Sequence, residues 1–342
     1  MIRGLALAGV LLCFSVVVLG AYVRLTDAGL GCPDWPGCYG HLTPLGAEQS
    51  AAVRVAFPSK PLDVGKAWRE MIHRYAAGTL GLIIVVIAAL AISCRRAKLV
   101  NTAYAIALLA IVVFQGLLGM LTVTWQLKPL IVTLHLLFGM TTLGLLWWLW
   151  MSLPRHSWGG LRTHSIGRPA LAGGATPSLR IALRLALLGL AALGVQIALG
   201  GWTSSNYAAV ACPDFPRCQN AWWPHTDYGD AFVLWRGLAL NYEGGVLDNP
   251  ARVAIHLTHR LGAVVTTMAL GVAALFVIGR PALSGVRISA YAVLAALALQ
   301  LAIAVSMVLE TFPLLLATAH TAGAALLLLA TLALVRSTTR LR

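Results

Sequence analysis

Four histidines fall in long apolar stretches of this chain, and they form two similarly spaced pairs. His73 and His135 are 62 residues apart in the first half, and His259 and His320 are 61 residues apart in the second. An imidazole in lipid is costly unless it is buried and partnered. Two imidazoles in each half could bind one iron from both sides, as the axial ligands of a heme do. Interhelical hydrogen bonding is the plainer alternative for any one of them.

A carboxylate accompanies the first of these histidines. Glu70 lies three residues before His73, so both project from one face of a helix. A carboxylate in such a pocket suits general acid/base work or the stabilisation of a cationic intermediate. The second half has His256 at the corresponding position, so one half would do chemistry while the other holds a permanent cofactor. A plain ion pair of Glu70 with Arg69 or Arg74 is the alternative.

An arginine directly follows the first histidine of each pair, as Arg74 and Arg260. A guanidinium group binds a carboxylate through two parallel hydrogen bonds. The propionates of a heme are carboxylates, so these arginines are candidate propionate partners. Snorkelling to lipid headgroups is an equally good interpretation.

Two cysteine pairs precede the histidine pairs. Cys32 and Cys38 enclose Pro-Asp-Trp-Pro-Gly, and Cys212 and Cys218 enclose Pro-Asp-Phe-Pro-Arg. We expect a Cys32–Cys38 and a Cys212–Cys218 disulfide, since the predicted compartment is oxidising. A structural role is the main hypothesis, and a redox role stays open. The spacing is not the Cys-x-x-Cys of zinc sites.

Long apolar segments must position these groups. Hydrophobic residues make up 59% of the chain and charged residues 11%, about half the charged fraction of a soluble domain. A membrane span needs about 20 mostly apolar residues. Eight stretches qualify: 4–23, 70–93, 101–124, 129–151, 180–202, 252–279, 286–309 and 313–335. The sequence therefore predicts an all-α integral membrane protein with eight transmembrane helices.

The basic residues predict its orientation. With the N-terminus inside, fourteen Lys and Arg residues from Arg3 to Arg342 fall on the inner side, and all eleven acids fall on the outer side or at outer helix ends. This is the positive-inside bias of cytoplasmic loops. We therefore expect a multi-pass protein of a bacterial inner membrane, with both termini cytoplasmic and the cysteine loops periplasmic. The net charge of +14 is explained by anionic lipid and requires no nucleic acid.

The two halves read as a tandem duplication. An offset of 180 aligns Cys32 with Cys212, and an offset of 185 aligns His135 with His320. Four spans per repeat predict two four-helix bundles related by a pseudo-twofold axis along the membrane normal. The expected division is an N-terminal bundle at 1–153, a cytoplasmic linker at 154–179 and a C-terminal bundle at 180–342. The long outer loops, about 24–69 and 203–251, are expected to cap the bundles.

These residues resemble the heme A synthase family. The matching segments are residues 20–30 (Gly-Ala-Tyr-Val-Arg-Leu-Thr-Asp-Ala-Gly-Leu), Glu70 to Arg74 (Glu-Met-Ile-His-Arg), His135, the His259-Arg260 pair and His320. The outer loops match bacterial members that carry such cysteine pairs. The resemblance covers the whole chain, including its eight spans.

The resemblance implies an oxidoreductase that converts heme O to heme A by oxidising a ring methyl to a formyl group, for use by terminal oxidases. His73 and His135 would bind the iron of the substrate heme O. His259 and His320 would bind a heme b cofactor, and Glu70 would be catalytic. Heme O synthase and cytochrome oxidase assembly factors are candidate partners, and membrane lipid surrounds the chain.

Two other functions fit the same histidines. A membrane b-type cytochrome would use four ligands symmetrically for electron transfer and need no lone carboxylate. A heme transporter or chaperone would hold exchangeable heme in both halves and leave the porphyrin unchanged.

Overall fold

The computed structural model describes residues 1–58, 60–93, 100–154, 177–237 and 240–339. Eight of its helices are long and apolar enough to cross a membrane. Those of the first half are α1 (Ile2–Leu25), α4 (Val64–Ser93), α5 (Thr102–Thr124) and α6 (Pro129–Ser152). Those of the second half are α7 (Pro177–Ser205), α9 (Asn249–Ile278), α10 (Arg287–Leu309), which follows the short η3 (Pro281–Val286), and α11 (Leu314–Thr339). The predicted eight-span, all-α class is confirmed.

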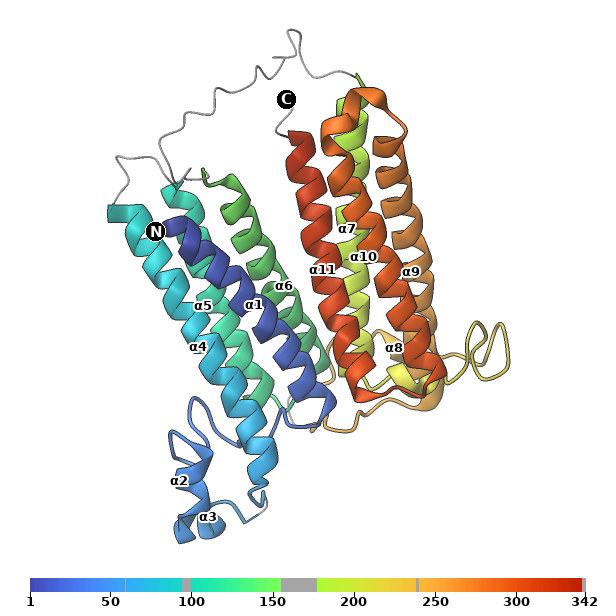
Figure 1. Ribbon diagram of the computed structural model, residues 1–342. Coiled ribbons are helices and arrows are strands. Elements are labelled where there is room, and N and C mark those ends of the chain that lie inside the picture. The colour runs from blue at the N-terminus through green and yellow to red at the C-terminus, as the bar shows by residue number, and fades with distance from the viewer. Residues whose placement is uncertain (59, 94–99, 155–176, 238–239, 340–342) are drawn as a thin grey trace.

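The spanning helices pack as two groups of four. α1 contacts α4 and α6, and α5 contacts the same two helices; in the second group α7 and α10 both contact α9 and α11. Figure 1 shows the groups side by side, joined through contacts of α6 with α7, of α1 with α11 and of α6 with α11. The pseudo-twofold relation and the division into domains stay predictions. Most of the expected linker, 155–176, lies outside the described residues.

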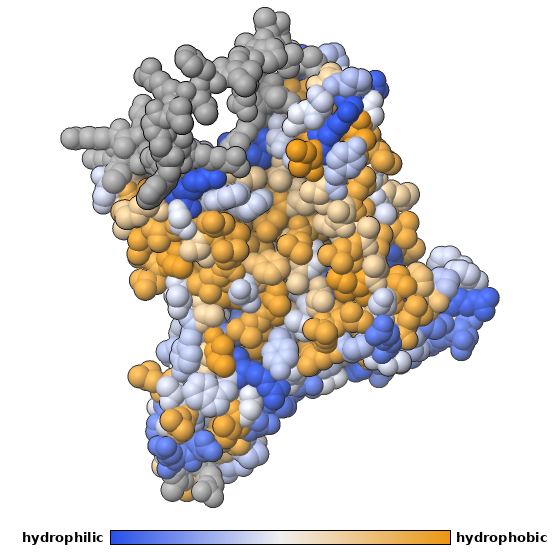
Figure 2. Space-filling model, viewed as in Figure 1, coloured by the Kyte–Doolittle hydropathy of each residue, from blue (hydrophilic) through white to orange (hydrophobic). Residues whose placement is uncertain are grey.

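Apolar side chains cover the faces that these helices turn outward. Figure 2 shows a broad hydrophobic band across the middle of the molecule, with polar residues toward both ends. The interior is built from small and branched residues such as Ala6, Ile84 and Leu143, all fully buried. Backbone groups are satisfied within each helix, which is what a hydrocarbon environment demands of a spanning segment.

The long connections gather at one end of the molecule. The first carries α2 (Pro44–Glu48) and α3 (Ala51–Ala56), and the second carries η2 (Ala209–Ala211) and α8 (Tyr228–Ala231). In Figure 1 the start of α1 and the end of α11 lie at the opposite end from α2, α3 and α8. Both cysteine loops therefore lie at the same end of the eight helices, opposite the start of α1 and the end of α11.

The second long connection also reaches the first half of the chain. Lys128, in the turn between α5 and α6, is only 1% exposed. Its ammonium group lies 3.1 Å from the ring centroid of Trp235 and donates to the carbonyl of Gly237. The backbone N–H of Tyr242 donates to the carbonyl of Gln126 at 3.1 Å. The loop therefore packs over the ends of helices from both halves, on the side that carries the cysteine loops.

Candidate functional site

The first histidine pair meets between α4 and α6. The ring centroids of His73 and His135 are 6.5 Å apart, with an angle of 78° between the ring planes. Both rings are partly buried. The structure therefore brings together two residues that the sequence separates by 62 positions.

The second pair repeats this geometry between α9 and α11. The ring centroids of His259 and His320 are 6.4 Å apart, with an angle of 84° between the planes. The nearly equal separations show that both halves hold their imidazoles at one spacing.

This spacing fits two axial ligands of one metal. Metal–imidazole bonds are about 2 Å long, so two ligating nitrogens lie roughly 4 Å apart and the ring centroids a little over 6 Å. Either ring can turn about the ligand axis, so the angle between planes is not restricted. The described residues contain no group of three or more His, Cys, Asp or Glu that could hold a metal ion. A pair of imidazoles suits a macrocycle that brings its own equatorial ligands.

Glycines on neighbouring helices leave room for the rings. A Cβ built at Gly20 on α1 would lie 2.9 Å from Cε1 of His73, and one at Gly200 on α7 would lie 3.2 Å from Cε1 of His259. Gly119 on α5 stands in the same relation to His135, at 3.3 Å. Larger residues at these places would press on the candidate ligands.

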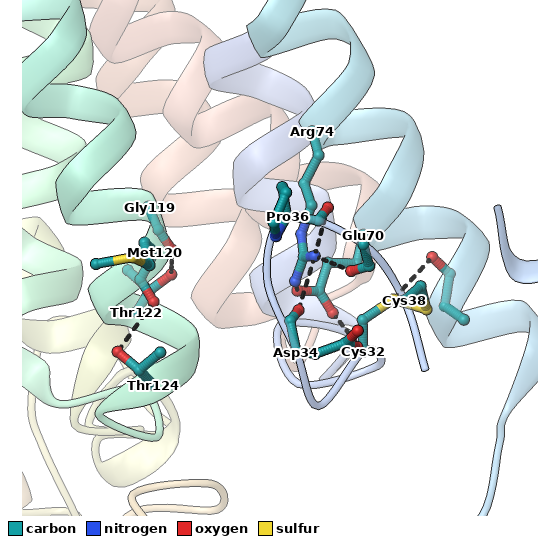
Figure 3. A network of polar contacts seen from close by, with 12 residues as sticks. Cys32, Asp34, Pro36, Cys38, Glu70, Arg74, Gly119, Met120, Thr122 and Thr124 are labelled. Carbon is teal, nitrogen blue, oxygen red and sulfur yellow. Dashed lines mark hydrogen bonds and ion pairs between the residues drawn. A yellow bond between two sulfur atoms is a disulfide. The ribbon is translucent and has the colours of Figure 1, made fainter. Parts of the chain in front are cut away.

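Glu70 is buried, with 4% exposure, near the N-terminal end of α4. One carboxylate oxygen accepts the backbone N–H of Cys32 at 2.8 Å, and the other forms an ion pair with Arg74 (Figure 3). The ion pair that the sequence left open therefore exists. It also fixes the carboxylate one helical turn from His73, because a helix places residues i and i+3 on one face.

The arginines that follow the first histidines point into the cysteine loops. Arg74 donates to the carbonyls of Asp34, Pro36 and Gly37 at 2.9, 3.2 and 2.5 Å. Arg260 donates in the same way to the carbonyls of Arg217, Cys212 and Asp214 at 2.7, 3.2 and 2.8 Å. Each guanidinium thus ties a loop to the helix that carries a candidate ligand. The propionate role of both arginines stays a prediction.

Both predicted disulfides are present, Cys32–Cys38 and Cys212–Cys218. An aspartate organises each loop: Asp34 accepts the backbone N–H groups of Tyr39 and Gly40 at 2.6 and 2.8 Å.

In the second loop, Asp214 accepts the N–H groups of Gln219 and Asn220 at 2.6 and 2.9 Å. Partial burial works to raise the pKa of Asp214, but these backbone donors and nearby Arg260 outweigh it and hold the pKa below its ordinary value.

The two halves differ beside the first histidine. His256, at the position that matches Glu70, is 5% exposed, and its Nδ1 lies 3.2 Å from the carbonyl of Ala208. It takes no part in an ion pair among the described residues, whereas Glu70 does. The lone carboxylate therefore marks the first half as chemically distinct.

Three glutamine amides lie beside the histidines. Gln115 donates to the carbonyl of His135 at 2.8 Å, and Gln300 donates to that of His320 at 3.1 Å, so both bridge helices. Gln196 on α7 was missed, and its Nε2 lies 3.1 Å from Nδ1 of His259. The signal was a polar residue in an apolar span whose counterpart in the first half is Val16.

Comparison with known proteins identifies relatives along nearly the whole chain. A family model described as "Cytochrome oxidase assembly protein" matches residues 3–332. A protein named heme A synthase from Shewanella oneidensis is 41% identical over 319 residues, which cover 92% of this chain and 89% of that protein. Proteins of the same name from Rhizorhabdus wittichii and Paracoccus denitrificans are each 26% identical, over 94% and 91% of this chain and 89% and 80% of their own lengths.

Proposed function

This chain belongs to the cytochrome oxidase assembly protein family, and from that membership we infer that it acts as a heme A synthase. It is an oxidoreductase that takes heme O as substrate and oxidises a ring methyl to the formyl group of heme A. The observation that carries this conclusion is the matched spacing of the two histidine pairs. Their ring centroids are 6.5 Å apart in the first half and 6.4 Å apart in the second, in a chain that is 41% identical to a heme A synthase.

We propose that the two halves divide the work. His73 and His135 would bind the iron of heme O, and His259 and His320 would hold a resident heme b. A bound heme supplies the redox chemistry that no amino-acid side chain provides. The support is the asymmetry beside the first ligand, because only the first half pairs its histidine with a buried carboxylate, Glu70.

Glu70 would act at the substrate. Its carboxylate is held by the N–H of Cys32 and by Arg74, so its position does not depend on solvent. A fixed carboxylate beside a reacting methyl can take up a proton or stabilise positive charge that develops there. The second half has an imidazole at this position and would lack this step.

The orientation of the chain follows from its charges. We propose that the ends of the chain face the cytoplasm of a bacterial inner membrane and that both disulfide loops face the periplasm, where cysteine pairs stay oxidised. In this orientation both histidine pairs lie toward the outer leaflet. Heme O synthase and assembly factors of cytochrome oxidase are the partners that this function would require.

Mass spectrometry of pigments tests the function. Cells that express the chain together with a heme O synthase should contain heme A, and cells with the heme O synthase alone should contain heme O. An extract that holds only heme B and heme O beside folded protein would reject the synthase. The remaining candidate functions would then be a b-type cytochrome, which oxidises and reduces its heme, and a heme carrier, which exchanges its heme.

A further inference from the structure

The two histidine pairs differ in what faces their second ring nitrogen. In the second half, amide Nε2 of Gln196 lies 3.1 Å from Nδ1 of His259, and that of Gln300 lies 3.2 Å from Nδ1 of His320. In the first half, neither Nδ1 of His73 nor Nδ1 of His135 has a hydrogen-bond partner among the described residues.

Glycines make the space that the second-half amides occupy. A Cβ at Gly262, three residues after His259, would overlap Oε1 of Gln196, and one at Gly323, three residues after His320, would overlap Oε1 of Gln300. The first half has Ala76 and Phe138 at the corresponding positions, and Val16 in place of Gln196. The carbonyls of Val16 and Gln115 face His73 and His135 without forming a hydrogen bond to either Nδ1.

We propose that Gln196 is a positioning residue that makes the second half retain its heme, while Val16 leaves the first half free to exchange its heme. This inference rests on the proposed function, since it assumes that His259 ligates iron. A metal-ligating histidine almost always donates its other ring N–H to an acceptor, which fixes the ring and raises its basicity. The carboxamide of Gln196 carries such an acceptor.

The amide can present that acceptor by turning about its terminal bond. Oε1 of Gln196 has no partner among the described residues. Its Nε2 also donates to the carbonyl of His259 at 3.0 Å, but a helical carbonyl keeps its bond within the helix. A half turn about the terminal bond would bring Oε1 to Nδ1–H of an Nε2-ligating His259 and would give up the bond from Nε2 to the His259 carbonyl. The side chain of Val16 offers no such group.

Heme transfer from the purified, heme-loaded protein to an excess of apomyoglobin tests the proposal. We expect Gln196→Val to release its second-half heme about tenfold or more faster than the wild type, because loss of such a partner costs 10- to 100-fold in metal affinity. Gly262→Ala keeps the glutamine but takes the space of its Oε1, so it should give a similar rate. The double variant should be no faster than either single one, since both changes remove one interaction.

A double variant in the first half tests the opposite change, in which the amide is added. Val16→Gln combined with Ala76→Gly rebuilds the amide and its space beside His73, and it should slow release of heme from that half. Gly78→Ala, on the same helix, is the control, because a Cβ there meets nothing within 4 Å.

The outcomes separate the possible failures. Unchanged transfer rates in Gln196→Val and Gly262→Ala would overturn the proposal, as would an unfolded Gln196→Val beside a Gly262→Ala with the wild-type rate. Faster transfer from a Gly262→Ala protein that elutes as the wild type does would support it. A wild-type chain purified without any heme b would instead reject the proposed resident heme of the second half.

Discussion

The hydroxyl of Tyr207 donates a 2.9 Å hydrogen bond to the carboxylate of Asp27, and the two residues are 180 positions apart. Arg24 donates at 2.7 Å to the carbonyl of Ser204, which is also 180 positions away. This number is the offset that aligns the two cysteine loops. Positions that correspond in the predicted repeat thus touch each other at the C-terminal ends of α1 and α7. A twofold axis would require this of residues that lie beside it.

The first prediction concerns this contact. Tyr207 also stacks beneath the guanidinium of Arg24, 3.9 Å from its ring centroid. Tyr207→Phe should remove only the hydrogen bond, worth about 0.5–1.5 kcal/mol, and Tyr207→Ala should remove the stacking as well. Thermal unfolding in detergent should rank the apparent midpoints as wild type, Phe, then Ala, with exposed Tyr228→Phe unchanged. Equal midpoints for Phe and Ala would show that the stacking contributes nothing.

The same contact should not depend on pH near neutrality. Burial raises the pKa of the Tyr207 hydroxyl above its ordinary value, so the hydroxyl keeps the proton that it donates. The difference between wild type and Tyr207→Phe should therefore be the same at pH 6 and pH 9.

The second prediction concerns the buried carboxylate. Glu70→Gln keeps the shape of the side chain and loses its charge, and with it the ion pair to Arg74. Formation of heme A should fall by about 10²- to 10⁴-fold, the usual contribution of one acid/base group, and heme O should accumulate. Glu310→Gln, at an exposed acid, is the control and should make heme A at the wild-type rate. Full activity in Glu70→Gln would leave this residue a structural role only.

The third prediction separates the two histidine pairs. On the proposed division of the two halves, His259→Ala should lose the absorption of the resident heme, because it removes one of the two proposed iron ligands together with the contact to Gln196. His73→Ala should largely keep that absorption and fail to make heme A. Spectra of the two purified variants, recorded beside pigment analysis of the same cells, check this. The reverse pattern would assign the resident heme to the first half.

The fourth prediction follows from the lowered pKa of Asp214. A carboxyl whose pKa is lower in the folded than in the unfolded chain stabilises the fold above its unfolded pKa, and this stabilisation is lost as pH falls through the folded value. Asp214→Asn should therefore unfold at a lower temperature than the wild type at pH 7. The gap should close below about pH 4, where carboxyls take up protons.

An exposed carboxyl of the same connection gives the reference for that measurement. Glu243→Gln should differ little from the wild type at either pH, since Glu243 is exposed. A gap for Asp214→Asn that persists unchanged at acid pH would mean that its hydrogen bonds act without the charge.

A structural feature could be predicted from the sequence where the residues that determine it lie close together in the chain. The eight spans follow from apolar length, because lipid demands about 20 such residues wherever a helix crosses. The disulfides could be predicted because the two cysteines of each pair are only six positions apart in the sequence. The cause of each lies within a few residues of the feature itself.

Other features depend on contacts between distant parts of the chain. Lys128 reads as a polar turn residue, yet it is buried because Trp235 and Gly237 cover it from more than 100 positions away. The targets of Arg74 and Arg260 and the partner of His259 likewise depend on which helix faces which. Spacing predicts that the histidines pair, but only the packing of the helices decides which groups face their second ring nitrogens.

The fifth prediction tests whether close helix packing sets the candidate ligand. A Cβ at Gly20 on α1 would lie 2.9 Å from Cε1 of His73, so Gly20→Ala must move the ring, the helix or both. Gly78→Ala, on α4, places its Cβ in open space, and alanine favours a helix over glycine by about 1 kcal/mol. We expect Gly20→Ala to weaken binding of heme O to the first half and to lower heme A formation, while Gly78→Ala unfolds at the same or a higher temperature and keeps full activity. Heme O titration of the purified variants, followed by absorption, measures the first effect. Equal binding by Gly20→Ala and wild type would show that His73 tolerates displacement and that α1 does not define the site.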